Sequence, residues 1–243
     1  MNYKVTRFEC IDSTNTLAKA LAKEGACEGT VIIANKQTQG RGRLGKSFFS
    51  PSETGLYMSI ILRPSLPPEK AVEITSLAAV ALLRTVKKLS DGDFKIKWVN
   101  DIYKNGKKVC GILTEASITA SGLEYAVLGI GVNLFAPQGG FPDEIKNIAD
   151  SVFECTFNKA KKEEFTTLLL DEISLLYNDI GKNRYVDEYR ENSYITGKKI
   201  FVLKGDEKIP ARACEILDDY SLSVTLESGE KAVLSSGDIS IRV

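Results

Sequence analysis

Residues 38–47, TQGRGRLGKS, are of types that bind anions, and their glycine spacing fits two nucleotide-binding patterns. Gly40, Gly42 and Gly45 match the G-x-G-x-x-G of dinucleotide-binding loops, and residues 40–47 match the G-x-x-x-x-G-K-[ST] of P-loops. Both patterns need a helix directly after the glycines, because the amides of its first turn hold the phosphate. The residues that follow, SFFSPSETG, leave no room for a helix before the next strand. We therefore interpret this stretch as a loop that joins two strands.

The charge of this loop is unusual. Lys36, Arg41, Arg43 and Lys46 lie within eleven residues that contain no acid. A solvated basic turn explains this pattern, and so does an anion clamp, in which glycines allow close backbone approach while guanidinium groups grip phosphate or carboxylate oxygens. In the second interpretation, Gln37, which directly precedes the loop, recognises a polar heteroatom ring of the ligand.

Two further stretches carry residues that could do chemistry. KIKWVNDIYKNGKKVCGILTEA (95–116) places Lys97, Asn100 and Asp101 at the end of one predicted strand, and Lys108 and Gly111 at the start of the next. The Asn-Asp pair is either a turn or a site for magnesium or a proton, and Trp98 is more typical of a core residue than of a ligand platform.

The other stretch is LGIGVNL (128–134). Glycine weakens a strand interior, so Gly129 and Gly131 indicate either a ligand lying flat against the backbone or a bulge and tight packing.

Composition narrows the chemistry available. The 243 residues hold 32 cations and 32 anions, so no global field attracts nucleic acid or a membrane surface. Neither an export leader nor a membrane-spanning run is recognisable. Five cysteines without a CxxC pair favour reduced thiols in a cytoplasmic protein. The absence of histidine excludes a Ser-His-Asp triad and a His-ligated metal.

The elements that must position these residues can be predicted from periodicity and punctuation. Strands are expected at 3–11, 30–34, 55–63, 94–98, 109–117 and 123–133, and helices at 14–24, from residue 67 or 68 to about 89, 160–180 and 183–192. From residue 197 onward, short strands alternate with turns. We therefore predict an α/β domain over 1–193, followed by a small β-barrel over 194–243.

The motifs together resemble one family. STN at 13–15, QTQGRGRLGKSFFSP at 37–51, KWVNDIY…KVCGIL at 97–113 and GIGVN at 129–133 are similar to the motifs of biotin–protein ligases. The resemblance implies a mixed β-sheet flanked by helices, related to class II synthetase cores, and an SH3-like C-terminal domain. Because STN begins close to Met1, we expect the short form that lacks a DNA-binding winged helix, and no specific DNA partner.

The resemblance also implies an activity. Such a ligase uses ATP and Mg²⁺ to activate biotin as biotinyl-5'-adenylate, and then transfers the biotin to a lysine of a biotin carboxyl carrier protein domain. The chain would act as a monomer or a homodimer. A lipoate or octanoate ligase of related fold remains an alternative, although no Arg-Arg-x-x-Gly-Gly segment is present. A non-catalytic biotin-binding regulator is the other alternative, and the set of cations argues against it.

Residue roles follow from the same resemblance. Biotin contacts are expected from Ser13, Thr14, Asn15, Gln37, Gly40, Arg41, Gly42, Arg43, Lys108, Gly111, Gly129 and Gly131. ATP contacts are expected from Arg43, Lys46, Phe48, Lys97, Asn100 and Asn133. Arg41, Arg43 and Lys108 would offset the anionic charge during catalysis, with Asp101 as base or orienting group. Asn100 and Asp101 would place the Mg²⁺.

Three positions depart from the family pattern. Phe48 replaces the usual tryptophan and offers a weaker stacking face for adenine. Val99 replaces the usual proline before Asn-Asp, which removes no chemical group. Lys46 replaces an arginine, which keeps the charge but loses the bidentate fork.

Overall fold

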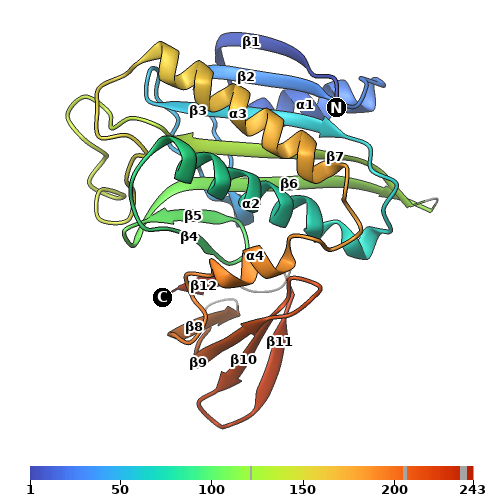
Figure 1. Cartoon of the computed structure of the whole chain (residues 1–243), viewed down its shortest axis with the longest axis vertical. Coiled ribbons are helices and arrows are strands. Elements are labelled where there is room, and N and C mark those ends of the chain that lie inside the picture. Colours follow the sequence, from blue (N-terminus) through green and yellow to red (C-terminus); the bar gives the residue numbers. More distant parts are fainter. Residues whose placement is uncertain (121, 205–206, 236–239, 243) are drawn as a thin grey trace.

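A large mixed sheet forms the body of the computed structural model (Figure 1), which describes residues 1–243 except 121, 205–206, 236–239 and 243. The order in this sheet is β1-β2-β3-β7-β6-β5-β4. Its strands are β1 (Lys4–Ile11), β2 (Thr30–Gln37), β3 (Gly55–Leu62), β4 (Phe94–Lys97), β5 (Asp101–Lys104), β6 (Lys107–Thr119) and β7 (Gly122–Asn133). β1 and β2 are parallel and every other neighbouring pair is antiparallel. The predicted mixed sheet is confirmed.

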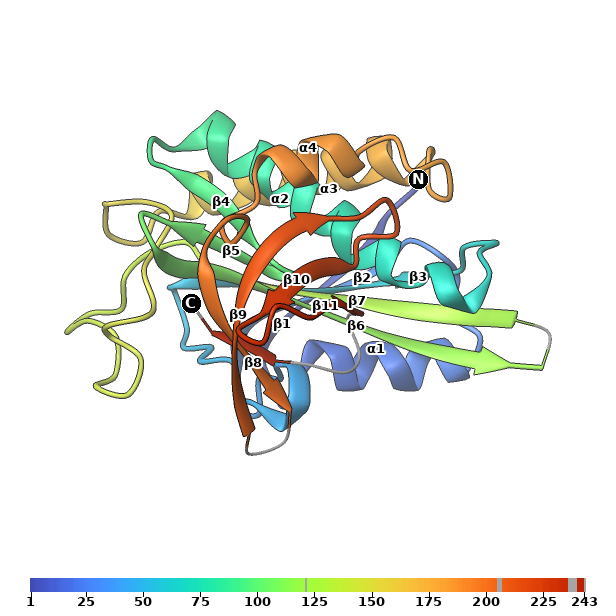
Figure 2. The ribbon, with the colours of Figure 1, turned by 90° about the horizontal axis from the view of Figure 1, so that it is seen from below.

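Helices cover both faces of this sheet. α1 (Thr14–Lys23) connects β1 to β2 on one face, while α2 (Val72–Leu89) and α3 (Lys159–Tyr177) lie on the other (Figure 2). α1 begins where Ser13 caps it, accepting a hydrogen bond from the backbone N–H of Thr16. Ala18 and Ala22 pack onto the sheet from one side of α1. The cap therefore brings residues 13–15 to the sheet surface.

The strand β5 was missed by the sequence prediction. Residues 98–100 form a turn, so Asp101 begins a strand instead of following one. β5 is four residues long and returns to β6 through Asn105 and Gly106, both with positive φ, as a tight hairpin turn requires. Asp101 then pairs with Gly111 on β6. Lys108 pairs with Tyr103, two residues further along β5, so Asp101 and Lys108 lie near each other on neighbouring strands.

A second, smaller sheet follows along the chain. It is antiparallel and contains β8 (Lys199–Lys204), β9 (Glu207–Ile216), β10 (Leu222–Leu226), β11 (Lys231–Leu234) and β12 (Ser240–Arg242), in the order β11-β10-β9-β8-β12. The short helix α4 (Val186–Glu191) lies between the two sheets along the chain. A domain boundary at 193/194 stays a prediction. Ser193, the last residue before it, is bridged to Ile96 of β4.

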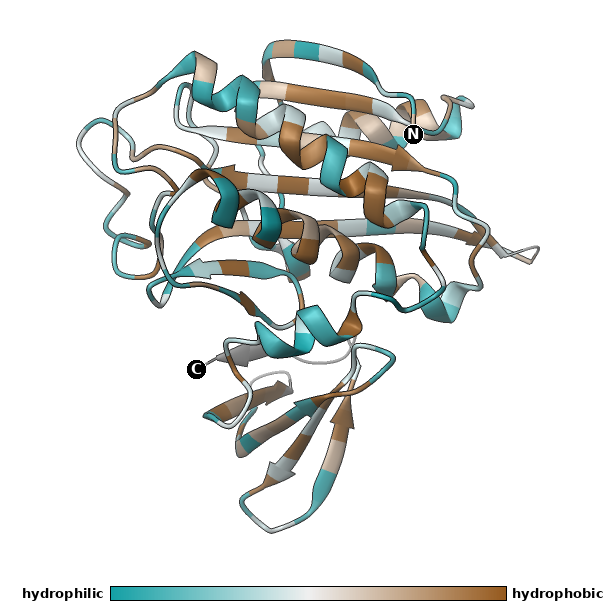
Figure 3. Cartoon of the chain, in the orientation of Figure 1, coloured by the Kyte–Doolittle hydropathy of each residue, from teal (hydrophilic) through white to brown (hydrophobic). Residues whose placement is uncertain are grey.

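Apolar side chains join the two sheets into one core. One buried cluster has members from Val31 in β2 to Leu234 in β11, and it includes strands of both sheets. Apolar positions concentrate along β3 and β7, whereas α4 is mostly hydrophilic (Figure 3). Among the described residues, no helix has the length and apolar character that crossing a membrane requires.

Candidate functional site

A cavity of about 680 Å³ lies at one end of the large sheet. Its walls come from the start of α1, the loop between β2 and β3, the β4–β5 turn, the first half of β6, the end of β7 and residues 145–149. A volume of this size suits a small organic ligand. Every residue with a predicted ligand role lines the cavity except Gly40.

Gly40 has a structural role in the loop instead. A Cβ atom at this position would lie 2.3 Å from the carbonyl oxygen of Phe48 and 2.6 Å from Oγ of Ser50. The Gly40 carbonyl accepts a hydrogen bond from the Phe48 N–H at 2.9 Å. The glycine is therefore needed for the two arms of the loop to meet, and a direct ligand contact at Gly40 stays a prediction.

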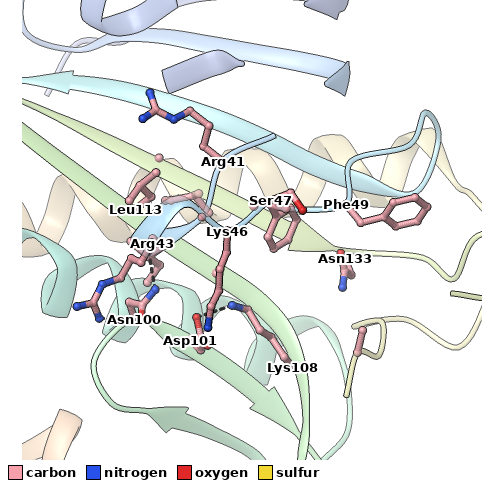
Figure 4. A pocket seen from close by; sticks show the side chains of 18 of the residues that line it. Arg41, Arg43, Lys46, Ser47, Phe49, Asn100, Asp101, Lys108, Leu113 and Asn133 are labelled. Carbon is pink, nitrogen blue, oxygen red and sulfur yellow. Dashed lines mark hydrogen bonds and ion pairs between the residues drawn. The ribbon is translucent and has the colours of Figure 1, made fainter. Parts of the chain in front are cut away.

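Positive side chains gather at one end of the cavity. Lys108 Nζ lies 2.7 Å from Oδ1 of Asp101, and Nη1 of Arg43 donates to Oδ1 of Asn100 at 3.3 Å. Lys46 reaches toward the same group (Figure 4). Asn100 is itself fixed, because its amide donates to the carbonyl of Ile112 at 2.8 Å. At this end of the site, Lys108 is paired with Asp101, Lys46 points toward the pair, and Arg43 bonds to the neighbouring Asn100.

Arg41 does not join this cationic group. Figure 4 shows its guanidinium directed away from Arg43 and Lys108. It lies 3.6 Å from Oε1 of Glu115, near the other end of the cavity. Arg41, Arg43 and Lys108 were predicted to act on one developing charge, but the structure brings together only the last two.

Electrostatics keep the two basic groups of this cluster charged. Burial alone would lower the pKa of Lys108, but the neighbouring Asp101 carboxylate outweighs it, so the net pKa is raised. Burial lowers the pKa of Arg43, an effect that Asp101 partly opposes. Arginine stays protonated in proteins at any ordinary pH. The cluster can therefore bind an anion at neutral pH.

Neutral polar groups lie at the opposite end. Oε1 of Gln37 accepts from the backbone N–H of Thr14 at 2.8 Å, and the buried Ser59 hydroxyl donates to Oδ1 of Asn15 at 2.6 Å. The amide of Asn15 in turn donates to Glu115 at 3.1 Å. Ser59 and Glu115 were not predicted. Glu115 shares a strand face with Gly111, so period-2 alternation along β6 could have identified it.

The two strand glycines make room for the protein's own side chains. A Cβ atom at Gly129 would lie 2.0 Å from Oδ1 of Asn15. One at Gly131 would lie 2.7 Å from Cε1 of Phe48, whose ring also lies near Gly111. Tight packing, one of the two interpretations left open by the sequence, is therefore correct for this structure. Direct contact between these glycines and a ligand stays a prediction.

The remaining predicted residues support the walls. The Nζ of Lys97 donates to the hydroxyl of Tyr103 at 3.0 Å, and the amide of Asn133 donates to the carbonyl of Asp150 at 3.2 Å. Within the described part of the chain, no three His, Cys, Asp or Glu residues are grouped to hold a metal ion. Asn100 and Asp101 offer oxygen atoms of the kind that Mg²⁺ prefers, but a metal there would need most of its ligands from water or a phosphate.

Comparison with known proteins identifies the family. Residues 7–133, more than half of the 243, match the Biotin/lipoate A/B protein ligase family. The chain belongs to this family. The matched residues include the start of α1, the glycine-rich loop (residues 38–47), and the strand glycines Gly129 and Gly131. They therefore include most of the cavity wall.

Individual members of this ligase family are similar over longer stretches. The "Bifunctional ligase/repressor BirA" of Bacillus subtilis is 40% identical over 159 residues, covering 65% of this chain and 49% of that protein. The "Biotin--[acetyl-CoA-carboxylase] ligase" of Mycobacterium tuberculosis is 29% identical over 235 residues, covering 93% and 85%. A biotin protein ligase from Aquifex aeolicus, solved in complex with biotin and ATP, has a TM-score of 0.80 and 25% identity, with 98% of each chain covered. This chain spans about half the length of the Bacillus relatives that it matches.

Proposed function

We propose that this chain is an ATP-dependent biotin ligase, which forms biotinyl-5'-adenylate and transfers the biotin to a lysine of a biotin carboxyl carrier protein domain. The main support is the division of one cavity into two ends. Around Asn15 the groups are mostly uncharged hydrogen-bonding groups and Arg41 is paired with Glu115, whereas the end around Lys108 is cationic. Biotin has the same division, with a neutral cyclic urea at one end and a carboxylate at the other.

In the first step, a carboxylate oxygen of biotin attacks the α-phosphorus of ATP, and pyrophosphate leaves as the mixed anhydride forms. A carboxylate needs no base at neutral pH, which suits a chain without histidine. The obstacle is the approach of two anions. Lys108 and Arg43 lower that barrier by holding positive charge where the negative charges meet. Lys46 and Phe48, also on the cavity wall, would contact the nucleotide.

In the second step, an acceptor lysine amine attacks the carbonyl carbon of the anhydride, an amide forms and AMP leaves. The amine must lose a proton, because its unperturbed pKa is about 10.4. Asp101 is the carboxylate nearest to the cationic group, and it would orient the amine or take its proton. Asn100 and Asp101 would hold Mg²⁺, which would supply further positive charge at the reacting phosphate.

The test is exchange of labelled pyrophosphate into ATP without any acceptor protein. Biotin should support exchange, and lipoic and octanoic acids should not. Exchange that depends on either of those acids would favour the lipoate-type alternative within the same family. Tight biotin binding without exchange would favour a non-catalytic regulator. Folded protein that neither binds biotin nor exchanges pyrophosphate would disprove the proposal.

A further inference from the structure

Glu115 contacts Asn15, a residue of the cavity wall, and is the centre of a small network. It is on β6, its side chain is 19% exposed, and it contacts three groups from two other segments. Nζ of Lys19 lies 2.8 Å from Oε1, Nη2 of Arg41 lies 3.6 Å from the same oxygen, and Nδ2 of Asn15 donates to Oε2 at 3.1 Å. A carboxylate so placed links α1 to the glycine-rich loop.

The orientation of the Asn15 amide depends on its acceptors. Its Nδ2 atom faces two oxygens, Oε2 of Glu115 and the carbonyl of Leu113 at 3.3 Å. An ionised carboxylate and a carbonyl can only accept hydrogen bonds, so the NH₂ group must point toward them. Oδ1 must then face Ser59, above Gly129. One lone pair of this oxygen remains available to a ligand N–H group, because an amide oxygen accepts two hydrogen bonds.

We propose that Glu115 is a positioning residue that fixes Asn15 with its oxygen toward the cavity, where it accepts a hydrogen bond from the N–H of a cyclic urea. This proposal rests on biotin being the ligand. It assigns Glu115 no direct contact with the ligand and no part in the chemistry. Its effect is on recognition of the ring end alone.

Charge around Glu115 supports this role. Burial would raise its pKa, but hydrogen bonds from Lys19 and Asn15 and the charges of Lys19 and Arg41 outweigh burial, so the net pKa lies below the ordinary value of 4.5. Glu115 is therefore ionised at neutral pH and acts as an acceptor only. A protonated carboxyl or an amide at this position could donate, which would remove one of the two acceptors that orient the Asn15 amide and leave only the Leu113 carbonyl.

The first test is Glu115→Gln in the full chain, with binding of biotin and of neutral biotinamide measured by calorimetry. Both affinities should fall by a similar factor, about tenfold, because the ring end is the same in the two ligands. In pyrophosphate exchange, KM for biotin should rise while kcat changes little. A matched control is Glu124→Gln, since the Glu124 side chain lies on an exposed part of the sheet and accepts a hydrogen bond from the Ser117 hydroxyl. The control should bind both ligands like the wild type.

If Glu115→Gln folds poorly, a second test uses substitutions at Asn15. Asn15→Asp sets two carboxylates against each other, so its biotin affinity should fall further. Adding Glu115→Gln to Asn15→Asp restores a donor opposite an acceptor, and most of the lost affinity should return. Two results would overturn the proposal: a folded Glu115→Gln variant that binds both ligands within twofold of wild type, or a double variant without recovery. Wild-type protein that binds no biotin would instead refute the proposed function.

Discussion

Lys108 meets Asp101 at 2.7 Å, so an anionic ligand must compete with Asp101 for the same ammonium group. Lys108→Ala should weaken biotin binding by about 10- to 100-fold, because a charge-assisted hydrogen bond contributes about 1.5–3 kcal/mol. It should leave biotinamide binding nearly unchanged, since that ligand carries no carboxylate. Calorimetry with the two ligands measures both effects. Equal losses for biotin and biotinamide would show that Lys108 supports the cavity without contacting the carboxylate.

The pH dependence at this site should be weak near neutrality. The pKa of Lys108 is raised above its ordinary value of 10.5 by Asp101, so the stabilisation from this pair is complete below 10.5 and is lost only as the pH rises through the higher folded-state value. The chain has no histidine, which is the side chain that ordinarily titrates near pH 6.5. Biotin affinity should therefore stay constant between about pH 6 and pH 9. A change of tenfold or more in this window, measured by calorimetry, would contradict the assignment.

At the scale of elements, β7 and the glycine-rich loop meet where the Phe48 ring lies over Gly131. Gly131→Ala would place a methyl group 2.7–2.9 Å from three atoms of that ring. We expect a loss of about 1–3 kcal/mol in the free energy of unfolding and a higher KM for ATP, because the ring must move. The measurements are urea denaturation and pyrophosphate exchange. Combining Gly131→Ala with Phe48→Leu should recover part of the stability. If it does not, the Phe48 ring is not the group that clashes with the new methyl group.

The glycine-rich loop should respond to biotin. Its base is held by backbone hydrogen bonds from Thr38 and Gln39 to residues 11 and 12, whereas Leu44 and Lys46 near its tip are exposed. Trypsin should cut the free protein at Arg41, Arg43 or Lys46, and biotin should protect these bonds, more so together with ATP. Mass spectrometry of the fragments gives the cleavage sites. Protection by Mg-ATP alone, unaffected by biotin, would be the behaviour of a P-loop and would contradict our interpretation.

The elements also show what the sequence could predict and what it could not. Long, strongly apolar elements such as β3 and α2 were predicted to within a few residues, because periodicity and flanking prolines define them. The strand β5 was missed because it is four residues long and two of them are charged. Alternation along β6 could have placed Glu115 on the same face as Gly111, but its contacts with Asn15 and Lys19 required the three-dimensional structure. Motif residues were predicted as a set, but the separation of Arg41 from Lys108 required the three-dimensional structure.

At the scale of the whole molecule, the two sheets should unfold together. Trp98 is the only tryptophan, is 5% exposed, and its Nε1 donates to the carbonyl of Tyr220 at 2.7 Å, next to the turn that carries Asn100. Tyr189 bonds to the carbonyl of Val99 at 3.0 Å in the same junction. Tryptophan fluorescence and far-UV circular dichroism should therefore give the same urea midpoint. Trp98→Phe should lower the free energy of unfolding by about 1–3 kcal/mol, because the Tyr220 carbonyl loses its donor. Two separate transitions in the wild type would show that the sheets are independent.

The cavity wall draws on segments from Ser13 to Tyr194, which belong to distant parts of the chain and meet only in the folded state. A ligand in this cavity has no comparable site on the unfolded chain, so its binding free energy adds to the stability of the fold. At about 100 times its Kd, a ligand raises the free energy of unfolding by about 2.7 kcal/mol. A shift in melting temperature is therefore a direct reading of affinity. Thermal melts with biotin, its analogues and other acids could rank the ligands of this protein without any assay of its chemistry.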